Sequence, residues 1–253
     1  MRNEEKNSRK QTGLRWITIG LLLIAAALFL ASYNVYDELR AEQAARQAVD
    51  KLDAYLPAEP SPEAPTGPAG GQGALVSDGQ TVIPDYVLCP NMEMPVENIN
   101  GIDFIGVLRI PALELELPII SEWNYPNLKT APCRYSGSAY LNNLILCGHN
   151  YTSHFGNLKK LGEGDFATFT DMDGNVFTYK MMERETLNPT DIEGMESGNW
   201  DLTLFTCTVG GQSRVTIRFE LLQDSIIIFE TRKIPGQRIF CCPGIRLRIV
   251  VIA

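Results

Sequence analysis

The sequence predicts an all-β domain, folded as a closed barrel with short helices, behind an N-terminal transmembrane helix and a flexible linker. Short β-prone runs broken by turn residues fill residues 83–222, for example 144–148 (LILCG) and 202–207 (LTLFTC). In residues 113–120 (LELELPII), leucine alternates with glutamate, as in a strand with one buried and one wet face. No stretch there resembles the long helices of a βαβ repeat. An antiparallel sheet of this kind hides its edges best by closing on itself.

An almost wholly apolar run covers residues 17–31, with Trp16 and Tyr33 beside it as interface anchors. Five basic residues precede this run and favour a cytoplasmic N-terminus. We therefore expect a cytoplasmic tail over 1–15, a single-pass anchor in the cell membrane over 16–33, and an extracellular remainder. The run is shorter than the roughly 20 apolar residues of a typical span, so a cleavable signal peptide is the alternative. The end of the run makes a poor small-x-small cleavage site, which favours the uncleaved anchor.

Two segments separate this anchor from the β-rich region. Residues 34–56 are rich in helix-forming Ala, Glu, Arg and Gln, and their apolar residues recur every three to four positions, which predicts a juxtamembrane helix or stalk. Residues 57–82 are dominated by Pro, Gly and small polar residues, so we expect a linker that holds the domain clear of the membrane. A single β-rich domain is expected over 83–222. For the extension 223–253, an added strand, a disordered tail and a non-native reading of the gene all remain open; its apolar runs are too interrupted for a second span.

Composition excludes two classes of function. A net charge of −8 and a pI near 4.9 argue against binding of nucleic acid, which normally needs a basic patch. The six cysteines lack the paired spacing of a zinc site, so we expect no metal and no cofactor. Spacing does not assign disulfides. Cys147 is most simply a packing residue, and no partner is evident for Cys89 or Cys133.

Only two histidines can supply an imidazole, His149 and His154. His149 closes the apolar run 144–148, which indicates a buried strand that delivers the ring to its end. His154 follows Tyr151 in a polar loop and is the weaker candidate. Either residue alone is most simply an ordinary surface or packed histidine.

Cys207 and Arg214 flank a short loop that contains Gly210 and Gly211, and this pattern predicts a hairpin with the two residues facing each other across its mouth. Strand alternation places 215, 217 and 219 on the core face and Arg214 and Arg218 on the other. Arg218 lies four residues further on, roughly 13 Å along a strand, and is the poorer partner for the thiol.

The three residue types together suit acyl transfer. A thiol attacks a peptide carbonyl, an imidazole moves protons, and a guanidinium stabilises the charge that develops on the oxyanion. An adjacent cation also favours the reactive thiolate. Taken alone, Cys207 is equally well explained as a buried structural cysteine.

Four segments resemble the sortase family, in the family's order. They are 106–111 (GVLRIP), 147–150 (CGHN, with the G-H motif), 203–207 (TLFTC, the T-L-x-T-C motif) and Arg214 at the start of the next strand. The resemblance covers roughly residues 100–222.

The resemblance implies a β-barrel transpeptidase that recognises a Leu-Pro-x-Thr-Gly-like sorting signal at the C-terminus of secreted proteins and cleaves after the threonine. Cys207 would hold the acyl group until an amine, from a cell-wall precursor or a pilin lysine, resolves it. His149 would be the general acid and base, and Arg214 the oxyanion or substrate clamp. The loop 208–213 is shorter than in many sortases, which leaves 183–199 as an alternative place where the signal is read.

Two other functions remain open from the residues: a hydrolytic cysteine protease, which would use water in place of the amine, and a non-enzymatic anchored β-domain that scaffolds surface proteins. The sequence-based interpretation makes three further predictions. A fragment beginning near Ile83 is expected to be soluble, monomeric and rich in β-structure. His154→Ala is expected to leave acyl-enzyme formation largely intact. Arg214→Lys is expected to lose most activity, and Arg218→Lys little.

Overall fold

The computed structural model describes residues 2–54, 56, 76–77, 80–81, 84–208 and 210–222. The extension 223–253 and most of the linker 57–82 lie outside these residues. The helices are α1 (Arg2–Leu52), α2 (Asp85–Leu88), α3 (Tyr125–Leu128) and α4 (Ile192–Glu196), with 3-10 turns at η1 (Pro111–Leu113), η2 (Ala139–Leu141) and η3 (Leu158–Lys160). The strands are β1 (Val76–Ser77), β2 (Gln80–Thr81), β3 (Glu97–Ile99), β4 (Ile102–Ile110), β5 (Leu115–Ile120), β6 (Cys133–Ser136), β7 (Leu144–Gly148), β8 (Phe166–Asp171), β9 (Val176–Leu187), β10 (Leu202–Cys207) and β11 (Arg214–Leu221).

The predicted barrel is confirmed. The large sheet runs β3-β4-β5-β6-β7-β10-β11-β9-β8, and β8 pairs back with β4, so eight of its strands form a closed ring. The seam requires Gly106, because a Cβ there would lie 2.2 Å from the Thr170 carbonyl oxygen on β8. We expected an antiparallel sheet, but two of its strand pairs, β5–β6 and β7–β10, are parallel. The second of these places two strand ends, and the residues that follow them, at the same edge of the barrel.

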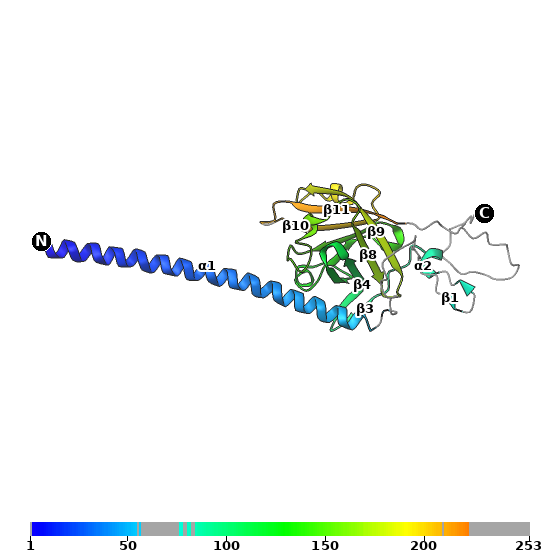
Figure 1. The fold of residues 1–253 in the computed structure, drawn as a ribbon, viewed down its shortest axis with the longest axis horizontal. Coiled ribbons are helices and arrows are strands. Elements are labelled where there is room, and N and C mark those ends of the chain that lie inside the picture. Colours follow the sequence, from blue (N-terminus) through cyan, green and yellow to red (C-terminus); the bar gives the residue numbers. More distant parts are fainter. Residues whose placement is uncertain are drawn as a thin grey trace.

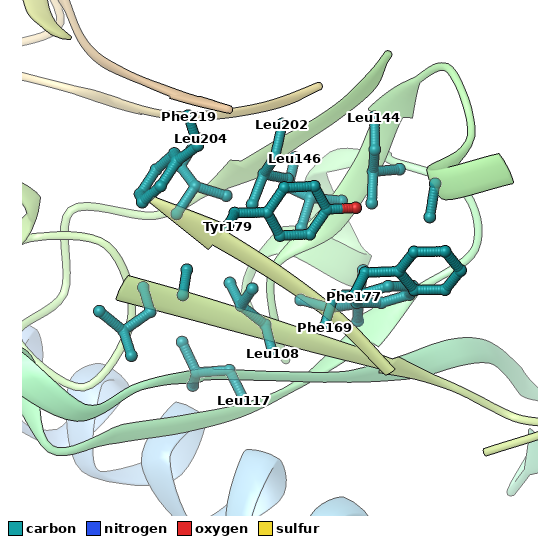
Figure 2. Packing of buried hydrophobic residues seen from close by; sticks show 14 of the residues in the cluster. Leu108, Leu117, Leu144, Leu146, Phe169, Phe177, Tyr179, Leu202, Leu204 and Phe219 are labelled. Atoms are coloured by element: carbon teal, nitrogen blue, oxygen red, sulfur yellow. The ribbon is translucent and has the colours of Figure 1, made fainter. Parts of the chain in front are cut away.

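Alternate residues of the barrel strands point inward and form the main core. Figure 2 shows these side chains gathered between the strands, including Leu108, Phe169 and Leu204. On β11, Ile217 and Phe219 belong to this core, as the alternation predicted.

A second apolar cluster lies on the outside of the barrel, and α1 covers it. Ala48 and Leu52 of α1 pack there with Val107, Ile120 and Cys133. Helix α1 is continuous over 51 residues, and in Figure 1 its C-terminal part lies along the barrel while its N-terminal part extends away from it. The barrel is therefore attached directly to the helix that contains the apolar stretch. The linker expected over 57–82 follows this packed part of α1 in the chain.

The N-terminal part of α1 is long and apolar enough to cross a membrane, and its described side chains from Arg15 onward are exposed as far as Tyr36. At the opposite end of the barrel from the β10–β11 loop, β8 and β9 are joined by a tight turn. The Asp171 carboxylate accepts hydrogen bonds from the backbone amides of Asp173 and Asn175, at 3.0 and 2.8 Å.

Candidate functional site

The three residues singled out by the sequence lie at one edge of the barrel, at the ends of adjacent strands. Cys207 ends β10 and is the direct cross-strand partner of Arg214, which begins β11. On the other side of β10, Thr206 is in register with Gly148 of the parallel strand β7, so His149 follows at the level of Cys207. Adjacent strands are about 4.8 Å apart. The fold thus brings together one thiol, one imidazole and one guanidinium.

All three side chains are accessible. Cys207, His149 and Arg214 are each half-buried. On β10, Leu202 and Leu204 point into the barrel core, so Cys207 points to the outer face together with its partner Arg214. A reacting peptide would reach the thiol from outside the barrel without opening the core.

The other residues of the two motifs hold the strand ends together. The Thr206 hydroxyl donates a 2.9 Å hydrogen bond to the Gly148 carbonyl, which ties β10 to β7 one residue before Cys207 and His149. A Cβ at Gly148 would lie 2.6 Å from the Phe155 ring, so only glycine allows this packing. Thr206 and Gly148 therefore have a structural function: they hold together the strand ends that Cys207 and His149 follow.

The loop between Cys207 and Arg214 is the expected tight hairpin turn. The Thr208 amide donates to the Ser213 carbonyl at 2.9 Å, and the Gly211 amide donates to the Thr208 carbonyl at 2.8 Å. Gly210 and Gly211 both have positive φ, of 84° and 71°, which glycine adopts without strain.

The His149 ring lies in an environment that favours its neutral form. Burial lowers its pKa below the ordinary value, the nearby positive charge of Lys129 lowers it further, and Asp37 opposes these effects. The ring stacks on Tyr151, with centroids 4.6 Å apart and planes at 14°. At neutral pH a neutral imidazole can accept a proton from the thiol.

Helix α1 contributes directly to this edge of the barrel, which sequence reasoning missed. The Tyr151 hydroxyl donates a 3.0 Å hydrogen bond to the Asp37 carboxylate. The backbone amide of Thr152 donates to the Glu38 carboxylate at 2.7 Å, and the Thr152 hydroxyl also bonds that carboxylate. A chain of contacts thus runs from α1 through Tyr151 to His149. No local pattern in the sequence could have indicated it, since the partners are 114 residues apart.

We expected His154 to lie in a polar loop, but its side chain is fully buried. Burial, with a smaller effect of His149, lowers its pKa to about 4. Among the described side chains neither of its ring nitrogens has a hydrogen-bond partner, and the Tyr151 ring lies 5.5 Å away. The complete burial of this ring supports a packing function.

Arg218 is the largest correction to the sequence-based interpretation. Its side chain lies on the same face as Arg214, as expected, but it is only 1 % exposed. It donates to the Glu185 carboxylate at 2.6 Å, the Thr203 hydroxyl at 2.9 Å, and the carbonyls of Met195 and Gly194 at 2.8 and 2.6 Å. Arg218 therefore joins β9, β10 and α4, and Arg218→Lys cannot be a nearly silent surface substitution.

Cys133 and Cys147 form no disulfide. Cys133 and Cys147 are cross-strand partners in the second cluster, both buried, in agreement with the packing function predicted for Cys147. Burial raises the pKa of the Cys147 thiol to about 12 and that of Cys133 still higher, so both stay protonated and unreactive at neutral pH. Within the described residues, no group of three or more His, Cys, Asp or Glu side chains is placed to hold a metal ion.

A row of aromatic rings lies beside Cys207 on the outer face. Phe205, two residues before Cys207, contacts Tyr135 edge-to-face at 5.3 Å, and Tyr135 stacks on Trp123 at 6.0 Å. The row borders a shallow pocket of about 370 Å³ that is lined by residues from 121 to 123 and from 134 to 137. An apolar peptide side chain could pack on this surface while its backbone approaches the thiol.

Comparison with known proteins gives one family match, over part of the chain. A family model described as a sortase domain matches residues 108–221. A comparison with curated proteins found no match.

Three solved structures are similar to the chain. Sortase C of Streptococcus pneumoniae is 22 % identical, with 50 % of this chain and 72 % of that chain covered and a TM-score of 0.45. A sortase D5 transpeptidase of Clostridium perfringens is 23 % identical, with 50 % and 83 % covered and a TM-score of 0.44. Sortase C of Clostridium perfringens is 24 % identical, with 50 % and 74 % covered and a TM-score of 0.44.

Proposed function

We propose that the chain, whose residues 108–221 match a sortase domain, is a cysteine transpeptidase that uses Cys207, His149 and Arg214. Its substrates are secreted proteins with a Leu-Pro-x-Thr-Gly-like sorting signal, cut after the threonine and joined to an amine. The observation that supports this most is the register of three strands, with Cys207 opposite Arg214 and His149 following Gly148 beside Thr206.

The reaction proceeds in two acyl transfers. His149 takes the thiol proton, and the Cys207 sulfur attacks the threonine carbonyl carbon to give a tetrahedral oxyanion. Arg214 donates hydrogen bonds to that oxygen, where its fixed charge and planar fork suit the developing negative charge. His149 then gives its proton to the departing glycine nitrogen, which leaves a thioester on Cys207. An incoming amine attacks the thioester carbonyl as His149 takes its proton, and His149 returns that proton to the departing Cys207 sulfur as the new amide forms.

The lowered pKa of His149 supports its function as the initial base, because the ring is neutral at neutral pH. Tyr151 holds the ring by stacking and is itself held by Asp37. The aromatic row of Phe205, Tyr135 and Trp123 is the surface on which the leucine and proline of the signal pack.

We also propose that residues 16–33 anchor the protein in the cell membrane with the N-terminus in the cytoplasm. The exposed apolar side chains of this part of α1 and the preceding basic residues support this orientation. A reporter that is active only in the cytoplasm, fused to the N-terminus, is expected to be active, and the barrel is expected to be digested by protease added outside intact cells.

The activity is tested with a fluorogenic peptide that carries the signal, with and without a glycine-peptide amine. Cys207→Ala is expected to abolish thioester formation detected by mass spectrometry, and Cys89→Ala, at another half-buried cysteine, to preserve it. Arg214→Lys is expected to lower turnover on the order of 10²-fold, and Arg184→Lys, an exposed arginine on β9, to change it little. Ligated product in the presence of amine distinguishes a transpeptidase from a hydrolytic protease. Absence of any thioester would contradict the proposal.

A further inference from the structure

The pocket at the end of the aromatic row contains a basic side chain that the proposed reaction does not use. Arg134 lies on β6 and lines this pocket together with Trp123 and Tyr135. The arginine is half-buried. Its Nε donates to the Ser121 carbonyl at 2.9 Å, and its Nη2 donates to the Ser121 hydroxyl at 3.4 Å. The two hydrogen bonds hold the guanidinium group in one position next to the aromatic rings.

The charge of Arg134 is not balanced by the protein. Among the described residues, no carboxylate forms an ion pair with Arg134, and its Nη1 has no hydrogen-bond partner. The buried Arg218 differs, because it is paired with Glu185 and donates from all three of its nitrogens. A half-buried guanidinium that is held in place but keeps a free donor is suited to bind a carboxylate of a ligand.

The pocket also contains one acidic side chain, Glu122, which would repel such a carboxylate. Glu122 is exposed, whereas Arg134 is half-buried. Water and salt screen an exposed charge more strongly than a partly buried one. We therefore expect Arg134 to decide which charge the pocket prefers.

The position of the pocket relative to the thiol indicates which part of a peptide reaches it. Phe205 precedes Cys207 by two residues, and its ring centroid lies 5.3 Å from that of Tyr135, which lies 6.0 Å from that of Trp123. With about 3.3 Å per residue along β10, the path from Cys207 to the end of the row is roughly 18 Å long. An extended peptide covers the same distance per residue, so the path takes about five residues. Counted back from the threonine of Leu-Pro-x-Thr, these residues extend one or two positions beyond the leucine.

We propose that Arg134 determines specificity for an acidic residue one or two positions before the leucine of the sorting signal. Its guanidinium binds that carboxylate while the leucine and proline pack on the aromatic row. The inference rests on the proposed function and narrows its substrates to signals that are preceded by Asp or Glu. This part of the signal stays on the acyl side of the bond that is cut. Arg134 therefore acts on recognition of the signal and not on the choice of amine.

Binding is measured first, on the Cys207→Ala protein, so that no reaction intervenes. Fluorescein-labelled signal peptides carry Asp, Asn or Lys at either of the two positions, and fluorescence anisotropy gives the Kd of each. At one of these positions, the Asp peptide is expected to bind about 10-fold more tightly than the Asn peptide, which corresponds to about 1.4 kcal/mol. Equal binding of the two peptides would overturn the inference, and so would a preference for Lys, which would assign the pocket to Glu122.

Variants of Arg134 then assign the preference to one side chain. In Arg134→Gln the ratio between the Asn and Asp peptides is expected to fall below about two-fold, with the affinity for the Asn peptide unchanged because the uncharged peptide makes no ion pair. Arg134→Lys keeps the charge but loses the planar fork, so about a three-fold ratio is expected. The matched control Arg184→Gln removes the same charge from an exposed site on β9 and is expected to keep the full ratio. A full ratio in Arg134→Gln would contradict the assignment.

Kinetics of the protein with Cys207 distinguish the signal from the acceptor as the source of the carboxylate. The Asp substrate is expected to have a KM about 10-fold lower than the Asn substrate, with kcat similar, because the contact is made before and during acyl transfer alike. Glycine-peptide acceptors with a free or an amidated C-terminus are expected to react equally in the unaltered protein and in Arg134→Gln. If Arg134→Gln instead changes only the preference between these acceptors, the carboxylate belongs to the acceptor and the inference is wrong. Selective binding of the Asp peptide without any thioester on Cys207 would reject the proposed function and leave the Arg134 contact standing.

Discussion

The packing of α1 on the barrel makes a quantitative prediction, because two leucines of the same helix differ only in what they contact. Leu52 is 0 % exposed in the second cluster, and Leu39 is 52 % exposed. Replacing either with alanine changes helix propensity equally. Leu52→Ala removes a fully buried side chain and leaves a cavity, which typically lowers the free energy of unfolding by about 3 kcal/mol. Leu39→Ala is expected to change it by less than about 0.5 kcal/mol.

The assay is urea unfolding of a soluble chain that begins at Asn34, followed by circular dichroism. With a slope of about 2 kcal/mol/M, Leu52→Ala is expected to lower the midpoint by about 1.5 M and Leu39→Ala by less than about 0.3 M. Similar midpoints for the two variants would refute the packing of α1.

The same reasoning replaces the expectation for a fragment that begins near Ile83. Burial of five α1 side chains (Ala41, Ala45, Ala48, Val49 and Leu52) contributes about 6 kcal/mol to the free energy of unfolding. This figure takes about 0.8 kcal/mol for each of the three alanine methyl groups and about 2 kcal/mol each for Val49 and Leu52. This is comparable with the whole stability of a domain, about 5–15 kcal/mol. We therefore expect the shorter fragment to unfold at much lower urea than the chain from Asn34, and to aggregate through the uncovered cluster. Identical unfolding curves would contradict this.

Three further predictions concern single side chains. Arg218→Lys removes most of the four hydrogen bonds of a buried side chain, which is expected to lower the free energy of unfolding by about 3 kcal/mol and the melting temperature by about 9 °C. Arg214→Lys is expected to leave the melting temperature nearly unchanged. Calorimetry of the two variants measures both temperatures. His154 has a pKa of about 4 when folded against about 6.5 when unfolded, so its contribution to stability is present above pH 6.5 and is lost as the pH falls toward 4. NMR titration of the two histidine rings measures this directly, and a ring that titrates near 6.5 at His154 would contradict its burial. Iodoacetamide is expected to modify Cys207 in the native protein and to spare Cys147 until the protein unfolds, as peptide mass mapping will show.

Local patterns in the sequence were sufficient for much of the fold and for the arrangement of the candidate site. Alternation and turn residues predicted the strands and the closed barrel. The Gly-Gly turn was enough to place Cys207 opposite Arg214, because register in a short hairpin depends on the loop itself. His149 was correctly expected at a strand end, although only the parallel pairing of β7 with β10 brings it beside the thiol.

Burial was harder to predict, because it depends on what packs over a residue from elsewhere in the chain. Arg218 and His154 occupy positions that look polar and exposed in sequence. Arg218 is covered by β9 and α4, whose contacts with it are more than 20 residues away. His154 lies close enough to Glu38 of α1 for that carboxylate to affect its pKa, and the polar residues beside it in the chain gave no signal of its burial.

By itself, the sequence determined the elements whose information is local: the apolar helix, the strands, the hairpin, and the motifs that resemble a known family. Only the tertiary structure decided that the helix expected over 34–56 packs on the barrel and contacts the edge that carries the candidate site. Its apolar positions predicted a helix but not what the helix would contact, since alanines spaced three to four apart suit a solvent-exposed stalk as well as a packed one. The contact of Asp37 with Tyr151 joins residues 114 positions apart. Such pairings form only when a closed barrel presents a surface that fits the helix.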